Sequence, residues 1–314
     1  MQPHIEIDST RSAVLALGER FWGWEIPVYL FLGGLVAGLM LTVSVVILSL
    51  GKERVTRAMK LGLVAAPVLL GLGMGALFLD LTYKLHTFRF YTALRLSAPM
   101  SLGSWVLLLV VPVQVLLILA LPAAELVPWL DKVPLVGPAR AFADKHLRGL
   151  AWAGVGLGVA LGIYTGVLLS TTVANPLWAS GALGFLFLAS GSSTGVAALM
   201  IAERDENTHA LLARADIGLM AFELVVITLW LIGLSTQGAI YRTAATLLIS
   251  GPYAPVFLGF VVFGGLLVPI FLEAMALRGR ALHSRAVPAL VLGGGLLLRF
   301  VLVYAGQEVR FVTG

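Results

Sequence analysis

The amino-acid sequence predicts an all-α integral membrane protein with eight transmembrane helices. Of its 314 residues, 59% are hydrophobic and only 12% are charged, whereas a soluble domain carries about 25% charged residues. Eight apolar runs are each close to the ~20 residues that cross a bilayer. Because backbone polar groups in lipid must be satisfied within their own segment, these runs are expected to be helices.

The spans follow one another along the whole chain, which predicts a single membrane domain over residues 1–314. The 122–148 connection contains four prolines, which interrupt a helix, so it is expected to lie at the membrane surface. The eight expected spans are 25–50, 61–79, 99–121, 149–171, 178–200, 216–235, 254–274 and 286–304.

An even number of spans places both termini on one side, and the basic residues indicate which side. The connections on one side hold 13 Lys and Arg, against 7 on the side of the termini. Since positive charge is retained in the cytoplasm, both termini are predicted to be periplasmic. The first 20 residues lack the apolar core of a cleavable signal peptide, so the first span is expected to direct insertion. The net charge of +5 does not indicate nucleic-acid binding, because the basic residues lie in short connections, where they indicate the orientation of the protein in the membrane.

Glycines recur at four-residue spacing in several of the expected spans. The fourth span has Gly154, Gly158, Gly162 and Gly166. Such stripes let helix backbones approach closely, so we interpret them as packing surfaces. The alternative is a groove for a flat ligand.

The residues that could bind a metal are few. The chain has no cysteine, which excludes disulfides, thiolate iron–sulfur ligation and covalent haem attachment within it. None of its five histidines falls in the middle of an apolar run, so a haem held between helices is not expected. If this protein handles electrons, a different subunit must carry the metal centres.

The connection from Asp80 to Trp105 is the longest polar, aromatic-rich connection on the periplasmic side. This connection has two possible interpretations: a solvated loop with interfacial aromatic anchors, or a functional site. The second follows because ionisable groups at a bilayer boundary cost free energy and are therefore commonly functional. The outer ends of the first four spans converge on the same side. Their candidate residues are Trp24, Glu25 and Tyr29 in the first, Asp80 and His86 after the second, Ser104 in the third, and Tyr164 and Asn175 in the fourth.

This set of groups suits a quinone. A quinone ring needs hydrogen-bond donors at its carbonyl oxygens and an acid or imidazole to move protons, beside an apolar slot for the tail. Tyr164 lies eight residues inside Thr172, or ~12 Å below the outer boundary, where a phenol needs a hydrogen-bond partner. That partner is either a ligand or a neighbouring backbone carbonyl.

The second half of the chain offers two candidates for a proton route, Glu223 and Arg299. Glu223 lies near the middle of its span, where a carboxylate is either protonated and hydrogen-bonded or part of a proton pathway. Arg299 lies towards the outer end of the last span and could snorkel to the surface or pair with a carboxylate.

Several segments, in order along the chain, resemble the NrfD/PsrC family of membrane subunits. These segments are FWGWEIPVYLFLGGLVAG (21–38), LDL (79–81), SAPMSLGSW (97–105), YTGVLLS (164–170), SGPYAPVF (250–257), VPIFLE (268–273) and GGGLLLRFVLVYAGQ (293–307).

The resemblance implies two four-helix bundles, here 25–171 and 178–304, with a quinone (menaquinone or ubiquinone) held in the first bundle near the outer surface. It implies electron exchange with a periplasmic four-cluster ferredoxin-like iron–sulfur subunit. A molybdopterin oxidoreductase or multihaem cytochrome would complete the complex.

The family's quinone-contacting tyrosine falls on Tyr164, and the acidic residue that ends the second helix falls on Asp80. Where family members have Asn and His near the start of the first helix, this chain has Trp24 and Glu25, and His86 is a possible substitute. We therefore expect Asp80, His86 or Glu25 to accept protons while Tyr164 hydrogen-bonds a quinone carbonyl.

Two other classes of function remain open from the sequence. Glu223, Arg299 and the glycine stripes would suit an ion or solute transporter. The halves show no convincing internal repeat, which many transporters have. A passive membrane anchor without a ligand is the third possibility.

Overall fold

The computed structural model describes residues 22–81, 99–121, 133, 135–171, 175–279 and 285–308. Within these ranges the regular secondary structure is helical and no strand occurs. Eight of the described helices are long and apolar enough to cross a membrane. The predicted all-α class and the number of spans are therefore confirmed.

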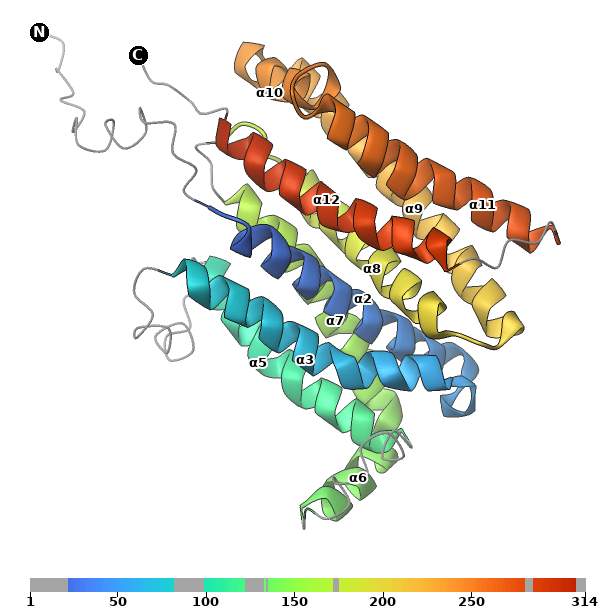
Figure 1. Ribbon diagram of the computed structural model, residues 1–314. Coiled ribbons are helices and arrows are strands. Elements are labelled where there is room, and N and C mark those ends of the chain that lie inside the picture. Colours follow the sequence, from blue (N-terminus) through green and yellow to red (C-terminus); the bar gives the residue numbers. More distant parts are fainter. Residues whose placement is uncertain are drawn as a thin grey trace, which may run out of the picture.

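Eight segments form the spans, and η5 and α11 together make one of them (Figure 1). Short helices lie between some of them: η1 (Lys52–Arg54), α6 (Val136–Lys145) and α10 (Ala239–Ile249). The spanning elements are α2 (Glu25–Leu50), α3 (Arg57–Asp80), α5 (Pro99–Ala120), α7 (Leu147–Ser170), α8 (Ala182–Ala202), α9 (Glu206–Thr236), η5 (Pro255–Leu267) with α11 (Val268–Leu277), and α12 (Ala286–Glu308).

The sixth span begins ten residues earlier than the sequence pattern predicted. Its 31 residues correspond to ~46 Å of helix, longer than the ~30 Å hydrocarbon layer. Asp205 caps its start, because its carboxylate accepts a hydrogen bond of 2.8 Å from the backbone N–H of Thr208. Charged residues lower the hydropathy of the first turns, so the sequence pattern does not identify these turns as part of the span.

Three connections contain short helices that were predicted from the sequence only as loops, the first being 51–60 with η1. The described part of 122–148 contains α6, a ten-residue helix that does not span, as expected of this segment. Residues 236–253 contain α10, eleven residues long, which packs against α9 and α12. The span that follows begins as the π-helix η5, a wide helical form that is rare and is often found at functional sites.

Helix α2 is the centre of the packing and contacts α3, α7, α8 and α12 (Figure 1). It approaches α8 through glycines: a Cβ on Gly38 would lie 3.0 Å from the Cα of Gly195, and one on Gly191 would lie 2.8 Å from the carbonyl oxygen of Gly34. Gly158 of α7 likewise faces the backbone of α2. These glycines serve as packing surfaces, whereas a Cβ added to Gly71 or Gly75 of α3 would have no neighbour within 4 Å among the described residues.

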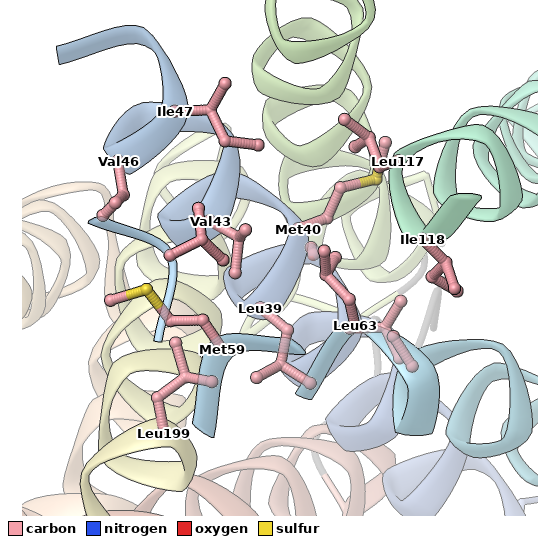
Figure 2. Close-up of a cluster of buried hydrophobic side chains, with 14 of the residues drawn as sticks. Leu39, Met40, Val43, Val46, Ile47, Met59, Leu63, Leu117, Ile118 and Leu199 are labelled. Carbon is pink, nitrogen blue, oxygen red and sulfur yellow. The ribbon is translucent and has the colours of Figure 1, made fainter. Parts of the chain in front are cut away.

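Apolar side chains fill the space around α2. Figure 2 shows one cluster of them, in which side chains of α2 meet those of α3, α5 and α8. The labelled members include Leu39, Met40 and Val43 of α2, Met59 and Leu63 of α3, Leu117 and Ile118 of α5, and Leu199 of α8. A second cluster packs α8, α9, η5 and α12 together.

The first and last described helices meet at the same end of the molecule. The side-chain amide of Gln307 accepts a hydrogen bond from the backbone N–H of Trp22 at 3.0 Å and donates one to its carbonyl oxygen at 3.2 Å. We call this the terminal end. The opposite end, where α2 connects to α3, α8 to α9 and α11 to α12, is the loop end.

Candidate functional site

Two carboxylates lie together at the terminal end. Asp80 is the last residue of α3 and Glu25 the first of α2. These two helices contact each other, and the negative charges are close enough to interact electrostatically. Both side chains are partly exposed, so each can exchange protons with water. Two acidic residues from separate segments of the chain therefore lie at the same end of the fold.

The aromatic residues of α2 next to Glu25 differ in exposure. Trp24 is 51% exposed, whereas Tyr29, just over one turn further into the helix, is 3% exposed and packs in the apolar core. Tyr29 thus lies on the inner face of α2, and Trp24 stands at its rim. Of these two aromatic residues, only Tyr29 faces the interior of the protein.

Tyr164 of α7 lies against the start of α5. The nearest atoms to a methyl group added at Gly103 would belong to the Tyr164 ring and hydroxyl, and such a methyl would overlap them. Glycine at this position is therefore what allows the phenol to pack directly on α5. Thr165, the next residue, faces Gly33 of α2, so this turn of α7 lies between α5 and α2.

The first turns of α5, which contain Gly103, also carry polar groups. Ser104 is buried and donates a 2.8 Å hydrogen bond to the carbonyl oxygen of Ser101. The indole N–H of Trp105 is buried and has no hydrogen-bond partner within the described residues. A buried donor without an acceptor costs free energy. A ligand carbonyl oxygen would remove that cost, so the donors present here fit a quinone.

Asn175 lies in the connection between α7 and α8. Its backbone carbonyl accepts hydrogen bonds from Trp178 and Ala179, and the Trp178 indole donates to the carbonyl oxygen of Leu302. The side-chain amide nitrogen of Asn175 is buried and unpartnered in the described part of the chain. Its backbone contacts place Asn175 beside Trp178, which stacks on Trp22 with ring centroids 5.2 Å apart. His86 lies outside the described residues.

In the second half of the chain, Glu223 and Arg299 are 2% and 0% exposed. They attract each other electrostatically, and both hydrogen-bond Ser190 of α8. Arg299 also donates to the carbonyl oxygen of Gly295 at 2.9 Å and lies over the Phe187 ring, 4.9 Å from its centroid. Of the two alternatives left open for Arg299, snorkelling is wrong, because its head group is enclosed between helices.

The other buried acids in this region were not predicted from the sequence. Asp216 is 0% exposed and Glu273 4% exposed, and their charges also interact. Asp216 lies seven residues before Glu223, on the same face of α9, which is a signal that could have been used. Glu273 on α11 has no such periodic signal.

Comparisons with known proteins agree in pointing to one family. A family model described as "Polysulphide reductase, NrfD" matches residues 16–310. The chain is 31% identical to the C chain of the polysulfide reductase of Wolinella succinogenes, over 91% of this chain and 94% of that protein. It is 28% identical to protein NrfD of Escherichia coli, over 95% of this chain and 98% of that protein. It is also 26% identical to the NrfD homolog of Haemophilus influenzae, over 91% of this chain and 94% of that protein.

Proposed function

Because the chain belongs to the NrfD family of polysulfide reductase membrane subunits, we propose that it is the quinone-reactive subunit of a respiratory oxidoreductase complex. Its family and its eight apolar helices identify it as a multi-pass protein of the bacterial cytoplasmic membrane. The proposed activity is electron exchange between the menaquinone or ubiquinone pool and a periplasmic iron–sulfur subunit.

The observation that carries this proposal is the grouping at the terminal end. The Tyr164 phenol lies against Gly103 of α5, and the Trp105 indole of the same helix has no hydrogen-bond partner among the described residues. The carboxylates of Glu25 and Asp80 lie at the same end of the molecule. Hydrogen-bond donors for a carbonyl oxygen and acceptors for a proton are the two kinds of group that a quinol oxidation needs.

Each residue has a distinct part in the proposed site. Tyr164 donates a hydrogen bond to a quinone carbonyl oxygen. Asp80, with Glu25 or His86, takes the protons of the quinol and passes them to water. Tyr29 and Ser104 line the slot, while Trp24 and Asn175 border it.

We further propose that the eight helices form two four-helix bundles, with the site in the first. In the first bundle, α2 and α5 each contact both α3 and α7, which closes a ring of four helices. In the second bundle, α8 contacts α9 and α12, α9 contacts α11, and η5 of the same span contacts α12, which closes another ring. The excess of Lys and Arg in the opposite connections favours a periplasmic terminal end.

The partner at that face would be a four-cluster ferredoxin-like subunit. Since this chain has no cysteine, it supplies no thiolate for a cluster. The partner's nearest cluster must therefore come close to the terminal end to accept electrons from the site. A molybdopterin oxidoreductase or multihaem cytochrome would then use these electrons.

The decisive experiment uses the purified complex. Solvent extraction should yield quinone in about one-to-one ratio to this chain, and added quinol should reduce the partner's iron–sulfur centres, followed by electron paramagnetic resonance. A transporter or a passive anchor would show neither result. Quinone present without cluster reduction would reject the electron-transfer role while retaining binding.

A further inference from the structure

A cavity of about 290 Å³ lies at the loop end of the second half of the chain, between α8, α9, α11 and α12. Its volume is close to the lower end of the ~300–1,000 Å³ found for small-molecule sites, so it suits a small polar group. The wall combines charged and apolar side chains, among them Glu206, His209 and Arg214 of α9, Glu273 and Leu277 of α11, and Val287 of α12.

The cavity lies at the level of the lipid headgroups. Glu273 is four residues before Leu277, where α11 ends, which is ~6 Å by helical rise. Glu206 and Val287 lie in the first turns of α9 and α12. The headgroup layer on each side of the hydrocarbon core is roughly 5–8 Å thick. A headgroup of the surrounding leaflet can therefore reach these residues.

Glu273 is a buried anion without a counterpart. It is 4% exposed, and neither of its carboxylate oxygens has a hydrogen-bond partner in the described part of the chain. The negative charge of Asp216 acts on it unfavourably. An unsatisfied buried carboxylate lowers stability, and an apolar residue would pack here without that cost. A ligand that brings both a positive charge and N–H donors would satisfy these oxygens.

Arg214 supplies the opposite charge in the same cavity. It is exposed, and none of the ion pairs within the described ranges involves it. A guanidinium binds phosphate oxygens through paired N–H groups. An anion alone would meet the charges of Glu273 and Glu206, and the described residues contain no group of three side chains suited to hold a metal ion. The lining thus favours a ligand that carries an ammonium group and a phosphate together.

Apolar surface begins beside the cavity on two helices. In Figure 1, α11 lies at the edge of the helix array, and outside its own span its main contacts are with α9 and α12. Leu267 and Phe271 are one turn apart and 43% and 63% exposed, and Phe271 adjoins the cavity residue Leu272. On α9, Leu211 is 40% exposed and adjoins the cavity residue Ala210. Acyl chains in the hydrocarbon layer would cover these side chains.

We propose that the loop-end cavity binds a phospholipid with an ethanolamine headgroup. The ammonium group hydrogen-bonds the carboxylate of Glu273, the phosphate binds Arg214, and the acyl chains lie along Leu267 and Phe271. A choline headgroup has no N–H to donate, and a glycerol headgroup has no positive charge. The site is at the opposite end of the molecule from the proposed quinone site and does not depend on that function.

The test measures lipid binding to the purified complex after its lipids have been removed in detergent. Dioleoyl phosphatidylethanolamine, phosphatidylcholine and phosphatidylglycerol share their acyl chains and differ in headgroup. Each is titrated while thermal unfolding and lipid retention in native mass spectrometry are followed, because a ligand of the folded state raises the unfolding temperature with its concentration. The ethanolamine lipid should bind about tenfold or more tightly than the other two, as expected for a charge-assisted hydrogen bond.

Glu273→Gln should have two effects of opposite sign. Without lipid, the variant should unfold at the same temperature as the parent or higher, because an unpaired buried charge is removed. Its preference for the ethanolamine lipid should fall about tenfold. A residue needed only for packing would lower the unfolding temperature and leave the preference unchanged.

Arg214→Gln changes an exposed residue and should weaken binding of the ethanolamine lipid, which provides a second test if Glu273→Gln does not assemble. The matched controls are Glu53→Gln and Arg148→Gln. Both residues carry exposed charges at the loop end and do not line the cavity, so neither change should alter binding.

Three results would overturn the proposal. The first is equal affinity for the three lipids, or a preference that both cavity variants retain. The second is tighter binding of phosphatidylglycerol, which would indicate a site for anions. The third is stabilisation by soluble phosphoethanolamine as strong as that by the lipid, which would mean that the acyl chains take no part. None of these results depends on quinone turnover, so the proposed function is tested separately.

Discussion

The terminal-end site and the buried polar cluster of the C-terminal half (Ser190, Ser193, Asp216, Glu223, Glu273 and Arg299) differ in where their ionisable groups lie. At the terminal end, Glu25 and Asp80 sit at helix ends and remain partly exposed. In the cluster, Glu223 and Arg299 sit within helices and are almost fully enclosed. A group at a helix end can exchange protons with water directly, whereas an enclosed group needs neighbours that hold and pass a proton.

The two regions also differ in how their geometry is fixed. Tyr164 of α7 packs directly on Gly103 of α5, where any side chain would overlap the phenol ring. Arg299 is held by groups of α8, by its own helix and by close approach to α2. Changes in the cluster should therefore affect stability most, and changes at the terminal end should affect quinone chemistry most.

The largest expected effect concerns the side of the membrane on which each end of the protein lies. A reporter enzyme active only in the periplasm should be active when fused after Gly314, because the charge asymmetry places that end outside. The same reporter inserted after Gly279, at the loop end, should be inactive. Activity in the reverse pattern would contradict the assignment and place the terminal-end site in the cytoplasm.

Removing the charge of Arg299 tests the enclosed region. Arg299→Met removes the cation that attracts the enclosed carboxylate of Glu223 and the donor to the Ser190 hydroxyl. The cost should approach that of a broken buried ion pair, about 3–5 kcal/mol. Thermal unfolding of the detergent-solubilised protein should show this loss. The double variant Arg299→Met with Glu223→Gln should recover part of it, since no unpaired carboxylate remains. A single variant as stable as the parent would mean that the pair contributes nothing.

Asp80 tests proton acceptance at the exposed region. Asp80→Asn keeps the shape of the side chain and removes its titratable group. Quinol-dependent reduction of the partner's clusters should fall by about 10²-fold, the lower range for a lost general base, because Glu25 remains nearby. Quinone binding, measured separately, should change little. Equal loss of binding and turnover would instead indicate a structural role.

Gly103 tests the contact that positions Tyr164. Gly103→Ala places a methyl group where the Tyr164 ring lies, and overpacking of this kind costs about 1–3 kcal/mol. We expect weaker quinone binding together with lower thermal stability. Gly75→Ala is the matched control, because no atom of the described part of the chain lies within 4 Å of its methyl position. If both variants behave alike, the phenol is not held by this contact.

The smallest expected effect is that of a single hydroxyl. Tyr164→Phe keeps the ring and removes the hydrogen bond, which is worth about 0.5–1.5 kcal/mol net and more when a buried partner is stranded. Quinol affinity or turnover should fall about 3- to 30-fold at ~1.4 kcal/mol per factor of ten. Parent-like values for both Tyr164→Phe and Asp80→Asn in an assembled complex would show that the quinone binds elsewhere, with the surroundings of Arg299 as the next candidate.

The sequence by itself determined the membrane fold and its eight spans. Apolar runs of bilayer length dictate helices because lipid offers no partners to backbone groups. It also placed Asp80 at the end of the second span and Tyr164 inside the end of the fourth, since position along a helix follows directly from residue number. It placed the start of the sixth span late, because Glu206 and Arg214 interrupt the apolar pattern of a helix that extends past the lipid.

Only the tertiary structure decided which side chains meet. That Ser190 lies between Glu223 and Arg299, and that Glu273 faces the cavity near Asp216, depends on how α8, α9, α11 and α12 rotate against one another. Helix rotation and spacing are set by the summed fit of many small contacts, including glycine-to-backbone approaches such as Gly38 with Gly195. A linear pattern records the spacing of residues within one helix, but not the relative rotation of two helices.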